Sequence, residues 1–144
     1  MRTHSSEGTL DCRISDILGM DESILSSAIV DNQGRTLASK TKFGAKDIFA
    51  SEKRGFKDDF GVWTRAVIQM VKPFDAEFGN CDSIVALYDD VKVMIMPVPS
   101  ARIHFVVVCL RSANAELIIC KFNEMLKSQP SKEFVHRGFN DIEK

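Results

Sequence analysis

The sequence lacks the short cysteine and histidine spacings of a metal centre or a redox pair. Such sites need two ligands within a few residues of each other. The candidate residues are instead scattered along the chain: Cys12, Cys81, Cys109, Cys120, His4, His104 and His136. We therefore predict no metal and no cofactor, and four reduced thiols, as is usual in the cytoplasm.

Long hydrophobic runs are also missing. The longest, Phe105–Leu110, is far too short to cross a bilayer. The first ten residues, MRTHSSEGTL, contain no apolar core of the length that a signal peptide needs. We therefore expect a cytoplasmic protein without a membrane span.

Neither sign of charge is in excess, because the chain has 19 Lys and Arg residues and 20 Asp and Glu residues, which gives a net charge of −1. Binding along nucleic acid requires a clustered basic excess, so nucleic acid is not an expected partner. The length of 144 residues suits one compact domain. Hydrophobic residues make up 44% and charged residues 27%, which is ordinary for a globular protein that needs no disulfide or metal.

No arrangement of residues predicts catalysis. His104 alternates with Ile103 and Phe105 on an expected strand, and no acidic residue at a fixed spacing is there to orient it. The adjacent Asp89 and Asp90 belong to an expected tight turn and point to opposite sides. No glycine-rich phosphate loop follows a strand. We predict no catalytic residues and no enzymatic activity.

The first half of the chain predicts a helix, a hairpin and a long loop. Apolar residues recur at helical spacing over Leu10–Met20. Two β-capable runs, Ser26–Asp31 and Arg35–Lys40, flank the turn sequence Asp-Asn-Gln-Gly, whose residues tolerate or favour the left-handed backbone. The stretch Lys40–Lys57 has a slight basic excess, and is either a solvated loop with hydrophobic anchors or a patch for an acidic partner.

The second half predicts a helix, three strands and a final helix. Apolar residues form a helical stripe from Phe60 to Lys72, which Asp58 or Asp59 would cap and Pro73 would end. After Gly79 the apolar period changes to two. The expected elements are strands Ser83–Tyr88, Val91–Met96 and Arg102–Leu110, the loop Pro97–Ala101, and the helix Ala113–Lys127 with Ser112 as its N-cap.

This order predicts an α+β fold. A five-stranded antiparallel sheet, made of a hairpin and a three-stranded meander, has three helices on its faces in the order α-β-β-α-β-β-β-α. The strand Arg102–Leu110 is apolar on both of its faces, so we expect it to be central and covered on both sides. The domain would span residues 10–127, between a flexible N-terminus (1–9) and a polar C-terminal tail (128–144).

In this order, the hairpin AIVDNQGRTLA (Ala28–Ala38) resembles that of the Roadblock/dynein light-chain family, within the wider group of longin and profilin-like folds. The meander Ser83–Leu110 and the amphipathic helix after it are also similar, and the resemblance covers about Leu10–Lys127. It implies a non-enzymatic protein-interaction module: a homodimer that binds or regulates a small GTPase, or acts as a scaffold. It also implies a sheet whose first and fifth strands are central and whose third strand is at an edge.

An edge position would leave Ser83–Tyr88 free to pair with a second copy, because the strand contains no Lys, no Pro and no internal charge to prevent it. On the helix Phe60–Lys72, Val62 and Ile68 flank the main stripe and could contact the same copy, although they could also be scattered surface hydrophobes. The predicted dimer interface consists of Val62, Ile68, Ile84, Val85, Ala86 and Leu87.

A second function remains open at this point, that of a PAS-like sensor for a small ligand. Its pocket would lie between helix and sheet, lined by Met70, Met94, Met96 and phenylalanines. Methionine adapts to irregular shapes, although it also fills ordinary cores. An internal cavity on the order of a few hundred Å³ would favour the sensor.

Overall fold

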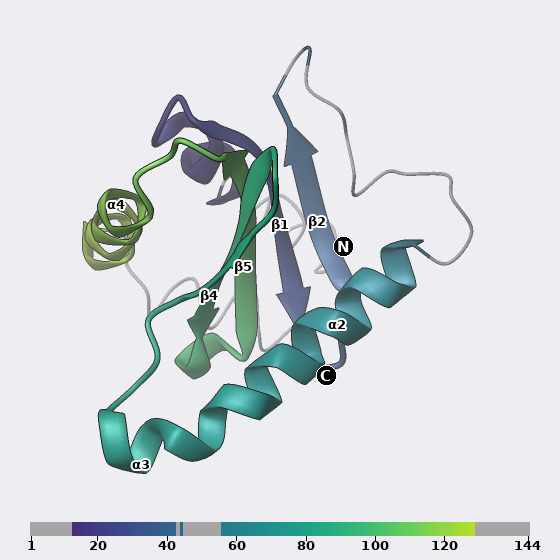
Figure 1. The fold of residues 1–144 in the computed structure, drawn as a ribbon, viewed down its shortest axis with the longest axis vertical. Coiled ribbons are helices and arrows are strands. Elements are labelled where there is room, and N and C mark those ends of the chain that lie inside the picture. Colours follow the sequence, from purple (N-terminus) through teal and green to yellow (C-terminus); the bar gives the residue numbers. More distant parts are fainter. Residues whose placement is uncertain (1–12, 43, 45–55, 129–144) are drawn as a thin grey trace, which may run out of the picture.

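The computed structural model describes residues 13–42, 44 and 56–128. Within them lies one antiparallel sheet with the spatial order β2-β1-β5-β4-β3 (Figure 1). Its strands are β1 (Ile24–Asp31), β2 (Thr36–Thr41), β3 (Ile84–Leu87), β4 (Val91–Val98) and β5 (Ile103–Leu110). The first and fifth strands are internal and the third is at an edge, which confirms the predicted sheet order.

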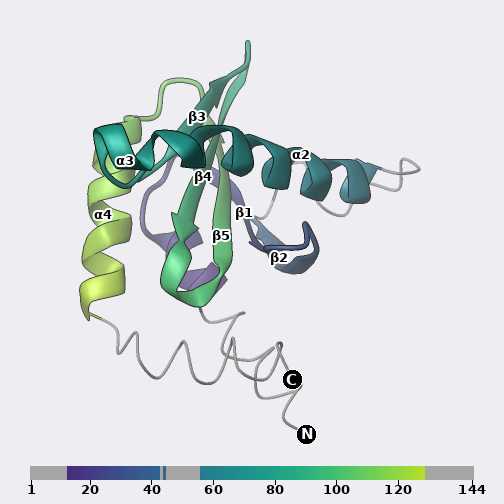
Figure 2. The same cartoon turned by 90° about the horizontal axis from the view of Figure 1, so that it is seen from below.

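Helices lie on both faces of this sheet (Figures 1 and 2). A helix over residues 13–19 precedes β1. The other helical elements are α2 (Phe56–Val71), η1 (Lys72–Phe74), α3 (Asp75–Phe78), η2 (Pro99–Ala101) and α4 (Ala115–Ser128). The predicted fold class is therefore confirmed, with η1 and α3 as an unpredicted continuation of α2.

The sheet separates two hydrophobic cores. The helix over residues 13–19 and α4 cover one face, where the Phe105 and Phe122 rings meet edge to face at 5.2 Å. On the other face, Trp63, Val67 and Ile68 of α2 pack on the sheet. Strand β5 contributes Phe105, Val107 and Cys109 to the first core and Val106 and Val108 to the second. The prediction that β5 is covered on both sides is confirmed.

The start of α2 was predicted wrongly. The helix begins at Phe56, four residues before the expected Phe60, so Asp58 and Asp59 lie inside it rather than at its cap. Its end at Val71, just before Pro73, agrees with the expected effect of proline. Gly79, with φ +83°, then ends α3. The loop prediction for Lys40–Lys57 concerns mostly residues outside the described part of the chain.

Two further boundaries differ, at the end of β4 and at the start of α4. Strand β4 continues through Pro97, which was expected in a loop. Strand β3 pairs with β4 only as far as Ile95, so the missing N–H of Pro97 removes no bond between these strands. At α4 the cap is Asn114 rather than Ser112, because its Oδ1 accepts the Leu117 N–H at 3.1 Å.

The turn between β1 and β2 is organised around a buried carboxylate. Asp31 is 5% exposed, and its Oδ1 accepts the backbone N–H groups of Gln33 (2.8 Å) and Arg35 (2.9 Å). Its Oδ2 accepts the Arg35 Nε–H at 2.8 Å. Gly34 has φ +82°, the left-handed conformation expected for the glycine of this turn. The turn packs directly against the backbone of α2 at Gly61.

Candidate functional site

Strand β3 lies at an edge of the described sheet. Its side chains alternate, so that Ile84 and Ala86 are half-buried beneath α2 while Val85 (38% exposed) and Leu87 (56% exposed) face outward. Tyr88, directly after the strand, is also exposed. The edge thus combines backbone groups that pair with no second strand of this sheet with an apolar side-chain surface.

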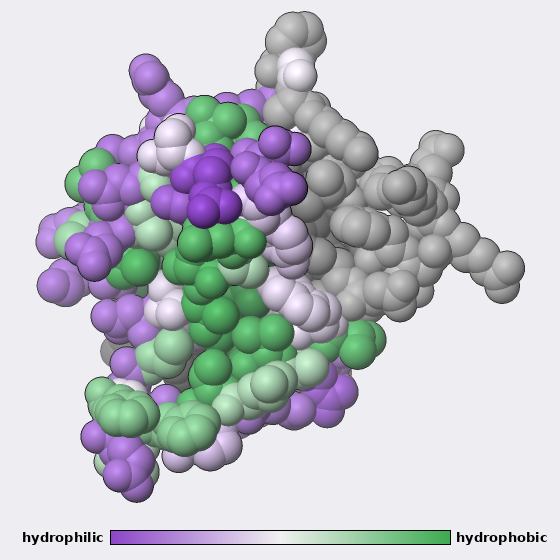
Figure 3. All heavy atoms as spheres, in the orientation of Figure 1, coloured by the Kyte–Doolittle hydropathy of each residue, from purple (hydrophilic) through white to green (hydrophobic). Residues whose placement is uncertain are grey.

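This edge belongs to a larger hydrophobic surface. Figure 3 looks onto the side of the molecule where β3 lies, and hydrophobic side chains form a band there between α4 and α2. Further hydrophobic side chains are exposed on α2, η1 and α3: Val62, Met70, Phe74 and Phe78. The Phe74 and Phe78 rings stack with their centroids 6.2 Å apart. Contiguous exposed hydrophobic surfaces mark interaction sites, whereas single exposed hydrophobic residues are common on any protein.

The opposite edge of the sheet has a different character. Strand β2, with the sequence TLASKT, exposes Ser39 and Lys40. The Lys40 Nζ donates a hydrogen bond to Ser15 Oγ at 2.9 Å. A lysine on an edge strand opposes pairing with another chain. Of the two edges, β3 is therefore the better surface for a partner.

The structure places the residues of the predicted interface in different environments. Val85 and Leu87 are exposed on β3, and Val62 is 65% exposed on α2. Ile68 is half-buried and packs on the sheet together with Ile84 and Ala86. Val62, Val85 and Leu87 thus offer the most free side-chain surface of the six.

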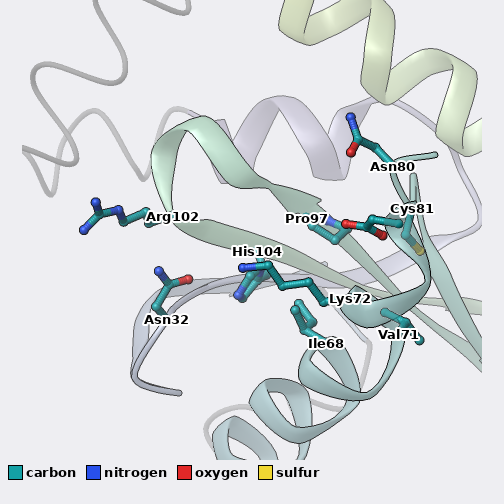
Figure 4. A pocket seen from close by; sticks show the side chains of 10 residues that line it. Asn32, Ile68, Val71, Lys72, Asn80, Cys81, Pro97, Arg102 and His104 are labelled. Carbon is teal, nitrogen blue, oxygen red and sulfur yellow. The ribbon is translucent and has the colours of Figure 1, made fainter. Parts of the chain in front are cut away.

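A pocket of about 450 Å³ opens where the end of α2 meets the end of β4 and the start of β5 (Figure 4). Its lining comes from four separate parts of the chain: Asn32, Ile68, Val71, Lys72, Asp75, Asn80, Cys81, Pro97, Arg102 and His104. No residue spacing in the sequence indicates this site, because the fold alone brings these segments together.

The pocket is not the methionine-lined cavity that a sensor would have. Met94 and Met96 are fully buried in the core beneath α4, and Met70 is 71% exposed. None of the three lines the pocket, which opens at the surface instead of lying inside the core.

His104 is the most deeply buried polar residue of this pocket. It is 7% exposed, and its Nδ1 has no hydrogen-bond partner. Burial lowers the pKa of His104 to about 4 from 6.5, although the negative charge of Asp31 opposes the shift. The imidazole is therefore neutral at neutral pH.

We expect this buried imidazole to make the domain less stable in mild acid. The unfolded chain binds a proton at His104 as the pH falls below 6.5, whereas the folded chain does not bind it until about pH 4. The free energy of unfolding should therefore fall by roughly 2 to 4 kcal/mol across this window. Urea titrations of the wild type and His104→Gln from pH 7.5 to 4 should show a much shallower fall in the variant, and parallel profiles would contradict this expectation.

Among residues 13–42, 44 and 56–128 no group of three His, Cys, Asp or Glu side chains could hold a metal ion. The three described cysteines, Cys81, Cys109 and Cys120, are free. Burial raises the pKa of the Cys109 thiol, which disfavours the reactive thiolate.

The arrangement of strands and helices matches solved structures. A Roadblock/LC7 domain from Streptomyces avermitilis superposes with a TM-score of 0.62 over 83% of this chain and 92% of that one, at 14% identity. The chain has the Roadblock/LC7 fold. The gliding protein MglB from Thermus thermophilus gives a TM-score of 0.64 at 9% identity, over 94% and 89% of the two chains.

A third structure with the Roadblock/LC7 fold is an MglB with a tetrameric arrangement, at a TM-score of 0.60 and 11% identity over 97% of this chain and 89% of that one. No family model and no curated protein sequence matches the chain. The likeness is thus one of fold. In the described part of this Roadblock/LC7 fold, no helix is long and apolar enough to cross a membrane.

Proposed function

We propose that this chain is a non-enzymatic protein-interaction module, a homodimer that binds or regulates a small GTPase or acts as a scaffold. The observation that supports it best is the β3 edge. In the described sheet this strand pairs on one side only, and its own side chains Val85 and Leu87 are exposed. The Roadblock/LC7 fold and the tetrameric arrangement of one structural neighbour agree with self-association.

A two-fold axis would set β3 antiparallel to its own copy and extend the sheet across the dimer. Four residues of strand are too few for a stable interface by themselves, since such interfaces bury about 800 Å² on each partner. Helix α2 can supply further area, because Val62 is exposed on it. We therefore include the exposed side of α2 in the proposed interface.

The dimer is tested by placing charge on the β3 edge. Light scattering of the wild type at micromolar concentration should give twice the chain mass of 16.1 kDa. The double variant Val85→Lys/Leu87→Lys should be monomeric, because two lysines from each copy would meet across the two-fold axis. Ser39→Lys adds the same kind of charge to the other edge strand and should remain dimeric.

Two results would contradict this arrangement. One is a wild type that stays monomeric at high concentration. The other is a β3 double variant that remains folded and dimeric, because the interface would then lie elsewhere.

The GTPase proposal needs a readout that depends on the nucleotide. Immobilised wild type and Val85→Lys/Leu87→Lys should be exposed to extract of the native organism loaded with GDP or with a non-hydrolysable GTP analogue. We expect a GTP-binding protein to be retained in one nucleotide state by the wild type and weakly by the variant. Equal retention in both states would favour the scaffold function.

A further inference from the structure

We propose that the corner formed by η1 and α3 docks a basic amphipathic helix of a partner protein. The apolar row of that helix would pack on Phe74 and Phe78, and its arginine or lysine side chains would face the carboxylates around the two rings. The corner precedes β3 in the chain and is built from other residues than the β3 edge. It therefore depends neither on the proposed dimer nor on a GTPase.

Two exposed phenylalanines form the apolar centre of this corner. Phe78 is 84% exposed, more than any other large hydrophobic residue in the described part of the chain, and Phe74 is 55% exposed. Their rings stack with the centroids 6.2 Å apart, so each ring limits the movement of the other. Large aromatic side chains held in this way are suited to anchor a protein interface.

The shape of this surface fits a helix. Met70, Phe74 and Phe78 follow one another at intervals of four residues along the consecutive elements α2, η1 and α3. Side chains with this spacing form a ridge, and a second helix packs by fitting such a ridge between its own side chains. All three side chains are exposed, so the described part of the chain leaves the ridge accessible. In Figure 3, hydrophobic side chains project at the corner where Figure 1 shows α3.

The segment that carries this corner is strongly acidic. From Pro73 to Asp90 the chain contains no basic residue and five acidic ones: Asp75, Glu77, Asp82, Asp89 and Asp90. The whole chain, by contrast, has a net charge of only −1. Lys72, just before the segment, extends in the direction of His104 (Figure 4). Negative charge is therefore concentrated in the segment that exposes the two rings.

Two of these carboxylates are neighbours of the rings. Glu77 is three residues from Phe74 and Asp75 is three residues from Phe78, a spacing that brings side chains together on a helical surface. Among the described residues no ion pair involves Asp75 or Glu77. A basic side chain at this corner would gain a carboxylate and, over a ring face, a cation–π contact. An anionic membrane surface, or the same acidic corner of a second copy, would be repelled instead.

The proposal is tested by NMR titration of the ¹⁵N-labelled full chain with a synthetic amphipathic peptide of leucine and arginine, about four helical turns long. We expect saturable shifts of the Ala76, Glu77, Phe78 and Gly79 amides. A peptide with glutamate in place of arginine should cause no shift. A peptide with serine in place of leucine should bind about tenfold more weakly, because it lacks the apolar row. Raising the salt concentration from about 0.05 to 0.5 M should weaken binding several-fold.

Substitutions at the corner should weaken binding of the leucine–arginine peptide. We expect a loss of about tenfold for Phe74→Ser and for Phe78→Ser, and about threefold for Glu77→Gln, as for an aromatic anchor and an exposed charge. Leu117→Ser is the matched control, because it removes an exposed hydrophobic side chain from α4, and its affinity should equal that of the wild type. All of the replaced side chains are exposed, and the amide spectrum of each variant shows whether it is folded.

Four results would overturn the proposal. The first is the absence of saturable shifts at these amides with the leucine–arginine peptide, and the second is equal binding of the glutamate peptide. The third is a Leu117→Ser variant that loses as much affinity as Phe78→Ser does, because the contact would then be unspecific. The fourth is a Phe78→Ser variant that loses self-association in light scattering or co-sedimentation with anionic phospholipid vesicles, either of which the wild type shows, since a second copy or a membrane would then occupy the corner.

Discussion

Replacing Gly61 by alanine should lower the free energy of unfolding by about 3 kcal/mol or prevent folding altogether. A Cβ at Gly61 would lie 1.7 Å from the carbonyl oxygen of Gly34, and real Cβ atoms essentially never come within 3.0 Å of such an atom. Both partners are backbone, so no side-chain rotation can relieve the contact. Helix α2 would have to move away from the β1–β2 turn and from the core beneath it.

Gly19→Ala is the control for this substitution. Gly19 also lies in a helix, but a Cβ there would meet nothing within 4 Å. Alanine should therefore be neutral or stabilise the domain by up to about 1 kcal/mol, the difference in helix propensity. Urea unfolding followed by circular dichroism measures both variants. A Gly61→Ala protein as stable as the wild type would show that α2 does not approach the turn so closely.

Asp31→Ala should lower the free energy of unfolding by about 2 to 4 kcal/mol, because three hydrogen bonds to a buried carboxylate would be lost. Two of them come from backbone N–H groups that would then lack their partner inside the turn. Asp31→Asn should cost less, since the carboxamide oxygen can still accept these two N–H groups. The same urea titration measures both variants.

Arg35→Ala separates the two roles of Asp31. The Arg35 side chain is 67% exposed, so its ion pair with Asp31 should contribute less than about 1 kcal/mol. If Arg35→Ala destabilises the domain as much as Asp31→Ala does, the ion pair rather than the capped turn is the main contribution of Asp31.

The sequence predicted the features that depend on the period of apolar residues. Of the apolar stripe predicted along α2, Trp63 and Val67 pack on the sheet, but Met70 is 71% exposed. Strand β5 is buried on both faces, as its apolar sequence indicated. The Asp31–Gly34 turn was also predicted, because the residues at a tight turn need particular backbone angles or local hydrogen bonds. These signals are local. Because one face of a helix or strand is buried, its apolar residues recur with the period of that element.

Element ends were less predictable, because several nearby polar residues can cap a helix equally well. Ser112 and Asn114 are both good N-caps, and the contact of Asn114 with the Leu117 N–H decides between them. Asp58 and Asp59 were predicted as N-caps, but both lie within α2, which starts at Phe56. Propensity could not resolve these cases, since it differs little between the alternatives.

By itself, the sequence determined the order of the elements, the central position of β5 and the unprotected character of the third strand. The tertiary structure decided that Gly61 meets Gly34 and that Lys72, Arg102 and His104 share one pocket. It also decided that Ile68 packs inward while Val62 stays exposed. Side-chain period is a local property of the chain, whereas these contacts join residues distant in sequence, and their positions follow from how α2 lies across the sheet.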